Sequence, residues 1–195
     1  MAAKKKPVES LDLEDLELDA DEVGLAGAWT AVDSATERPA RTAGTIVKDE
    51  GEGGKVLSSD APEFADYLVV PKVDALQAAF DAVSPAAVLV VSSAEGKEIA
   101  ARLALRIGSG IITDATDLEA GEQGPVATQA VFAASYTTKS RVSKGVPVIT
   151  VKPNSAPVEQ AAAAGAVEAL TVSFGEGATG TKVTSRTPRE STGRP

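Results

Sequence analysis

Two kinds of hydrophobic pattern alternate between residues 55 and 113. In two stretches, apolar residues recur three or four positions apart, which predicts two amphipathic helices with these stripes: Val73, Leu76, Phe80 and Val83; then Ile99, Leu103 and Ile107. Short apolar runs predict strands at residues 55–57, at 86–91 and from Ile111 onward. The unbroken Val-rich run at 86–91 is typical of a strand buried on both faces of a parallel sheet. This strand–helix order predicts right-handed parallel crossovers.

The second half of the chain has a different pattern. Residues 126–132, 135–142 and 146–152 are strand candidates linked by short turns, so we expect them to pair antiparallel. An alanine-rich stretch follows, and the last strand candidates are residues 167–174 and 182–187.

Residues 1–54 show no amphipathic pattern long enough for an independent fold. We expect an extended arm that becomes ordered only on a partner surface. The predicted fold class is therefore α/β: a small, partly parallel sheet with flanking helices, an antiparallel hairpin region and an extended N-terminal arm.

Composition narrows the possible functions. The chain has no cysteine and no histidine, which argues against disulfides, metalloenzymes and most hydrolases. No apolar run approaches the roughly 20 residues that span a bilayer, and no apolar stretch follows Lys4-Lys5-Lys6 as in a signal peptide. We therefore expect a cytoplasmic protein without membrane insertion.

Charge is unevenly distributed over the chain, whose net charge is −9. Residues 1–54 carry 13 acidic and 6 basic residues, whereas residues 126–195 carry 4 acidic and 8 basic residues. One interpretation is an ordinary solvated surface, and the other is that the acidic arm lies across the basic half of the same chain. No stripe of Lys and Arg with interleaved aromatic residues predicts nucleic-acid binding.

One segment is a candidate phosphate site. Ser92, Ser93, Gly96 and Lys97 follow a predicted strand and enter a predicted helix, where free backbone N–H groups attract anions. The alternative is a tight turn that needs glycine, with a solvated lysine. Because Glu95 and Glu98 would repel an anion, we favour the turn. We predict no catalytic residues and no metal site.

Several segments after residue 55 resemble one protein family. They are residues 67–76 (YLVVPKVDAL), 92–105 (SSAEGKEIAARLAL), 108–110 with Asp114, 146–151, 186–188 and 193–195. Together they are similar to the first domain of the electron transfer flavoprotein alpha subunit. The resemblance implies a fold related to the adenine-nucleotide alpha hydrolases.

The N-terminal segments resemble a different subunit of the same complex. Residues 1–7, 10–11, 38–44 and 49–54 are similar to the C-terminal arm of the beta subunit. On this resemblance, the arm contacts its neighbour through five residues: Arg38, Arg41, Thr42, Ala43 and Gly44. The alternative for these residues is a turn-rich linker.

The resemblance implies three parts: a beta-like arm at 1–54, an alpha-like domain at 55–187 without its first strands, and a hinge at 188–195 that precedes a flavin domain. In the family, an alpha–beta heterodimer carries FAD and passes electrons from acyl-CoA-type dehydrogenases to the respiratory chain. We expect this chain to supply scaffold and to bind no FAD by itself. Its expected partners are electron transfer flavoprotein subunits or a second copy, with dehydrogenases reached only through the complete complex. The alternative is a stand-alone module that binds adenine nucleotides or another subunit.

Overall fold

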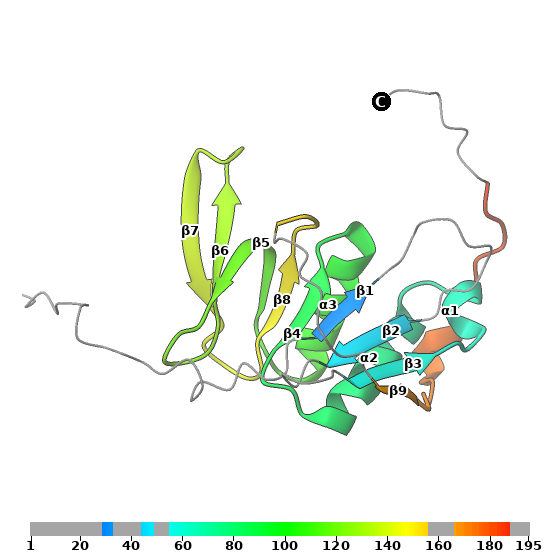
Figure 1. Ribbon diagram of the computed structural model, residues 1–195. Helices are drawn as coiled ribbons and strands as arrows, with labels where there is room; N and C mark the ends of the chain where they lie inside the picture. Colours follow the sequence, from blue (N-terminus) through cyan, green and yellow to red (C-terminus); the bar gives the residue numbers. More distant parts are fainter. Residues whose placement is uncertain (1–28, 33–43, 49–54, 156–165, 188–195) are drawn as a thin grey trace, which may run out of the picture.

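The computed structural model describes residues 29–32, 44–48, 55–155 and 166–187 (Figure 1). Within these ranges, nine strands form one mixed sheet in the order β7-β6-β5-β8-β4-β1-β2-β3-β9. The strands are β1 (Trp29–Val32), β2 (Gly44–Lys48), β3 (Lys55–Ser59), β4 (Val88–Val91), β5 (Ile111–Glu119), β6 (Val126–Val131), β7 (Tyr136–Arg141), β8 (Val148–Val151) and β9 (Ala166–Ala169). The helices are α1 (Glu63–Asp66), α2 (Val70–Val83), α3 (Ala94–Arg106) and the 3₁₀ helix η1 (Glu176–Thr179). The predicted α/β class is confirmed.

Helices α2 and α3 form as their apolar stripes predict. Pro71 lies in the first turn of α2, where its missing N–H costs little, and the helix ends at Ser84 in a left-handed conformation. α3 begins after Ser93, whose side chain accepts a hydrogen bond from the Gly96 N–H. None of the helices in the described ranges is long and apolar enough to cross a membrane.

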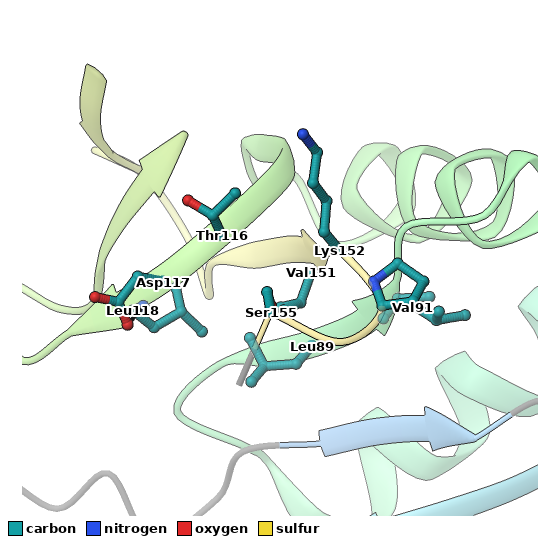
Figure 2. Close-up of a pocket in the computed structure, with 10 residues that line it drawn as sticks. Leu89, Val91, Thr116, Asp117, Leu118, Val151, Lys152 and Ser155 are labelled. Carbon is teal, nitrogen blue, oxygen red and sulfur yellow. Dashed lines mark hydrogen bonds between the residues drawn. The ribbon is translucent and has the colours of Figure 1, made fainter. Parts of the chain in front are cut away.

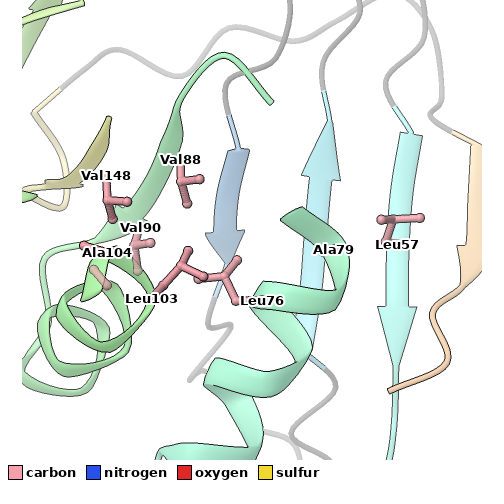
Figure 3. Packing of buried hydrophobic residues seen from close by; sticks show 9 residues of the cluster. Leu57, Leu76, Ala79, Val88, Val90, Leu103, Ala104 and Val148 are labelled. Carbon is pink, nitrogen blue, oxygen red and sulfur yellow. The ribbon is translucent and has the colours of Figure 1, made fainter. Parts of the chain in front are cut away.

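The main core lies between these two helices and one face of the sheet (Figure 3). Val88 and Val90 of β4 and Val148 of β8 are buried there against Leu76 of α2 and Leu103 of α3. The apolar residues three and four positions apart on each helix therefore face the alternate side chains that the strands direct toward the helices.

The other face of β4 is more open than the apolar run predicted. Leu89 and Val91 are only partly buried, in alternation with the buried Val88 and Val90. A second, smaller cluster occupies this face: Ile112, Ala115, Ala127 and Ile149, with Leu89, Leu118, Val142 and Val151 packed against it. The expectation of a strand fully buried on both faces is thus wrong for the described residues, because α2 and α3 cover only one face.

The pairing of β8 corrects a second expectation. β6 and β7 form the predicted antiparallel hairpin, but β8 inserts between β4 and β5 and is parallel to both. Val148, Ile149 and Thr150 are completely buried, so β8 has the residues of a central strand rather than of a hairpin edge.

The structure also contains two strands that the sequence analysis missed. β1 pairs in parallel with β4 and antiparallel with β2, which in turn pairs with β3. Two segments of the expected arm, β1 and β2, are therefore extended as predicted. They pair within the sheet of the same chain and not with a partner. β4 therefore has a parallel neighbour on each side, β1 and β8.

The last strand candidates are only partly confirmed. β9 covers Ala166–Ala169 and pairs in parallel with β3, while residues 182–187 contribute only an isolated bridge between Lys182 and Tyr67. The expected hinge at 188–195 lies outside the described residues, and so do residues 50–54, where the beta-like arm meets the alpha-like domain.

Two leucines of α3 provide a matched test of this packing. Leu103 is fully buried, whereas Leu105 is 82% exposed. Leu103→Ala should lower the free energy of unfolding by about 2–5 kcal/mol, because it leaves a cavity between helix and sheet. Leu105→Ala should change it by less than about 0.5 kcal/mol. Urea unfolding followed by circular dichroism measures both values, and equal losses would contradict this arrangement of α3.

Candidate functional site

The predicted phosphate segment lies where β4 ends and α3 begins. The Ser93 hydroxyl accepts the hydrogen bond of the Gly96 N–H at 2.9 Å and so caps the helix. A Cβ atom at position 96 would lie 2.0 Å from the Val91 carbonyl oxygen. Glycine is thus required by the close approach of helix and strand, which supports the tight turn rather than a phosphate cradle.

Ser92, which directly follows β4, belongs to a closed ring of hydrogen bonds with residues of β5 and β8. Its hydroxyl donates to Asp114 Oδ1 at 2.7 Å and lies 2.9 Å from the Thr150 hydroxyl. The Asp114 N–H donates to Thr150 Oγ1 at 3.1 Å. Thr150 can then donate to Ser92, so the fully buried Thr150 hydroxyl has both a donor and an acceptor partner.

Lys97 completes this polar cluster, which we define as Ser92, Lys97, Asp114 and Thr150. Its ammonium Nζ lies 2.7 Å from Asp114 Oδ2, so the two oxygens of this carboxylate bind different partners. The Lys97 ammonium, followed by the Ser92 hydroxyl, lowers the pKa of the Asp114 carboxyl below its ordinary value.

The backbone of Asp114 explains how the carboxylate reaches this position. Its φ of 61° is left-handed, and the pairing of β5 with β8 shifts register between Ile112 and Ala115. Such a bulge redirects one side chain of a strand, and Asp is among the few residues that adopt this conformation readily.

The two glutamates that we expected to repel an anion have other partners. Glu95 pairs with Lys72 at 2.5 Å, and Glu98 pairs with Arg102 one helical turn away. Their charges are thus balanced locally. The obstacle to anion binding is instead Asp114, which already occupies Lys97 and Ser92.

The polar cluster does not fit a flavin or nucleotide phosphate. Such a group would need free donors, but the Ser93 hydroxyl accepts from Gly96, Lys97 is paired with a carboxylate, and Ser92 donates to the same carboxylate. The chemistry that the cluster supports is structural: it connects α3 with β4, β5 and β8.

Of the five predicted contact residues of the arm, the structure describes one. Arg38, Arg41, Thr42 and Ala43 lie outside the described residues, whereas Gly44 begins β2 and pairs with Ser59 of β3. Their role in subunit contact stays a prediction.

A pocket of about 410 Å³ opens on the sheet face opposite α2 and α3 (Figure 2). Its floor is apolar, with Leu89, Val91, Leu118 and Val151. Lys152, Thr116, Asp117 and Ser155 supply polar groups around it. The Asp117 carboxylate accepts a hydrogen bond from the Leu118 N–H.

The sequence of this chain matches a known protein family. The family model of the electron transfer flavoprotein domain matches residues 52–174. The chain belongs to the electron transfer flavoprotein family.

Relatives of both subunit types are similar to this chain. The electron transfer flavoprotein subunit alpha of Mycobacterium leprae is 39% identical over 141 residues, which are 72% of this chain and 42% of that protein. The alpha subunit of Mycobacterium tuberculosis is 37% identical over 111 residues, 57% of this chain and 34% of that protein. The beta subunit of Mycobacterium bovis is 47% identical over 73 residues, 37% of this chain and 25% of that protein. The chain therefore spans less than half the length of each of these curated relatives.

Two members of the polar cluster were not recognised from the sequence. Asp114 lies inside the strand predicted from Ile111 onward, and its approach to Ser92 depends on the bulge between Ile112 and Ala115, which no sequence pattern marks. Thr150 could not be added, because its strand was expected to be antiparallel.

Asp114 should make stability depend on pH. Since its folded pKa is lowered, the carboxylate contributes stability at neutral pH that is lost as the pH falls through that pKa. Asp114→Asn, which tolerates the same backbone, should lower the free energy of unfolding at pH 7, and the difference from the parent should shrink toward pH 3. Urea titrations at several pH values measure it. Asp117→Asn removes the same charge from the same strand and is the control. Its free energy of unfolding should differ from that of the parent by less than for Asp114→Asn, and equal differences would contradict a specific role for Asp114.

Proposed function

We propose that this chain is a scaffold component of an electron transfer flavoprotein, which binds other subunits and carries no flavin of its own. Family membership supports the general role in electron transfer flavoprotein systems. The observation that carries the scaffold assignment is the Lys97–Asp114 pair, because it fills the one strand–helix phosphate candidate with an internal carboxylate.

In this proposal the redox chemistry belongs to the complete complex. Flavin binding requires phosphate donors and groups that tune the isoalloxazine ring, and in the polar cluster the Lys97 ammonium and the Ser92 hydroxyl already bind the Asp114 carboxylate. The partners are electron transfer flavoprotein subunits or a second copy of this chain. Acyl-CoA-type dehydrogenases are reached through that complex, in the cytoplasm.

A second candidate function is adenine-nucleotide binding, which the pocket on the open sheet face supports. Its apolar floor could accept a ring, and Lys152 could pair with a phosphate. The nearby Asp117 carboxylate opposes an anion at the same place. Isothermal titration with AMP separates this function from a pure scaffold.

The first test is flavin binding. Titration of the purified chain into free FAD should leave flavin fluorescence unchanged, because the Asp114 carboxylate already neutralises Lys97 and would repel a phosphate at this position. The intact apo heterodimer of a relative serves as positive control. Saturable quenching at micromolar protein, abolished by unfolding, would contradict the scaffold proposal.

The second test is subunit binding. When the chain is mixed with separately purified alpha and beta subunits of a mycobacterial relative, or run alone at increasing concentration, it should form a stable complex with a subunit or with itself. Arg38→Ala with Arg41→Ala should weaken that complex about tenfold or more, equivalent to ~1.4 kcal/mol, because charge-assisted contacts are lost. Surface plasmon resonance or sedimentation measures the affinity. Arg102→Ala on α3 is the control and should leave it unchanged; a monomer that binds neither subunit would contradict the proposal.

A further inference from the structure

The hairpin of β6 and β7 projects beyond the rest of the sheet (Figure 1). β5 pairs with β6 only from Val126 to Gln129, so Ala130 and Val131 pair with β7 alone among the described strands. The end of the hairpin, residues 130–137, is thus a two-stranded ribbon, a form that is marginally stable by itself. We propose that this ribbon and the open edge of β7 bind an acidic, extended segment of another electron transfer flavoprotein subunit, an inference that rests on the proposed function.

The tip of the ribbon presents two aromatic side chains to solvent. Phe132 is 79% exposed and Tyr136 is 66% exposed. Their rings meet edge to face with centroids 6.0 Å apart, so each ring restricts the other. Aromatic side chains that are already restricted lose little entropy on binding, and such residues dominate the energetics of protein interfaces. The pair therefore has the properties of an anchor for a protein partner.

The backbone of the tip is strained in a way that chain reversal does not require. Phe132, Ala133 and Ala134 have left-handed φ angles of 52°, 54° and 65°. This conformation costs free energy in residues other than glycine, asparagine and aspartate, which ordinary turns use for this reason. Backbone strain of this kind is concentrated at functional sites. The strained tip supports a binding role for the aromatic pair that it carries.

The open edge of β7 determines the kind of partner. β7 is the last strand of the described sheet, so one row of its backbone groups is free to pair with an added strand. Lys139 and Arg141 lie two residues apart and share one face of this edge. Lys139 turns inward to Glu119 at 2.6 Å, whereas Arg141 forms no ion pair with a described residue. An added strand with carboxylates at alternate positions complements these cations.

Two other occupants fit this surface less well. If two copies paired β7 with β7 about a two-fold axis, Lys139 and Arg141 of both copies would gather on one face, where like charges destabilise a sheet. An anionic membrane would attract the cations and the aromatic tip. The unpaired backbone groups of the β7 edge, however, would have no hydrogen-bond partner in hydrocarbon. A strand from a protein partner satisfies both the backbone and the charges.

Point variants of the hairpin test the surface in the complex with purified alpha or beta subunits of a mycobacterial relative. Phe132→Ala with Tyr136→Ala should raise the Kd about tenfold or more, and so should Arg141→Glu. The matched controls on α3, the exposed Leu105→Ala and Arg102→Glu, should leave the Kd unchanged. Surface plasmon resonance measures each value, and circular dichroism verifies that the variants fold.

The outcomes separate this inference from the proposed function. A complex that forms but is insensitive to the hairpin variants would overturn the inference and leave the scaffold role intact. Association of the chain only with itself would do the same. If the parent binds neither a subunit nor itself, both fail.

A second measurement reads the strand edge directly. On binding of the subunit, hydrogen exchange at alternate amides of β7 should slow about tenfold or more, because an added strand accepts their hydrogen bonds. Exchange in α3 should not change. Unaltered exchange along β7 in a formed complex would contradict the added strand. Sedimentation with vesicles of phosphatidylcholine and phosphatidylserine should leave the chain in the supernatant, and co-sedimentation that Phe132→Ala abolishes would replace the protein partner by a membrane.

Discussion

β8 lies between β4 and β5, and its parallel pairing with both determines the arrangement of everything around it. Three consecutive residues of β8 are completely buried and serve three different environments. Val148 faces the helices, Ile149 belongs to the cluster on the other face, and Thr150 enters the polar cluster at the strand ends. Because a shift of register by one residue would reverse these environments, the two cores and the polar cluster all depend on the same alignment.

The polar cluster has the location of a ligand site but the chemistry of a structural connection. A buried hydroxyl such as that of Thr150 needs partners, and the Asp114 N–H and the Ser92 hydroxyl provide them. The carboxylate of Asp114 then takes the place that an external anion would have next to Lys97. The cluster thereby joins one helix to three strands at a strand–helix junction.

Much of the fold could be predicted from local patterns. The stripes of α2 and α3 and the apolar run of β4 follow directly from hydrophobic periodicity, and the hairpin of β6 and β7 follows from its short turn. β8 was misassigned because its sequence neighbour is a hairpin, whereas its partners come from distant parts of the chain. β1 and β2 were missed because four or five residues without strong alternation carry little signal. The Lys97–Asp114 pair was missed for a related reason: it depends on a bulge in β5, which no periodicity marks.

The order of the strands in the sheet has a consequence for how the chain folds. β1 pairs with β4, β4 at the centre of the sheet pairs with β8, and β3 pairs with β9, although the two strands of each pair lie far apart in the sequence. Nearly all parallel ladders thus join segments that leave the ribosome far apart in time. The chain must lose the entropy of closing a long loop before the hydrogen bonds of each ladder can form. We therefore expect slow folding, with one edge of β1 unpaired until β4 has been synthesised and one edge of β3 unpaired until β9 has been synthesised. During those intervals the unpaired edges are places where the nascent chain can pair with other chains.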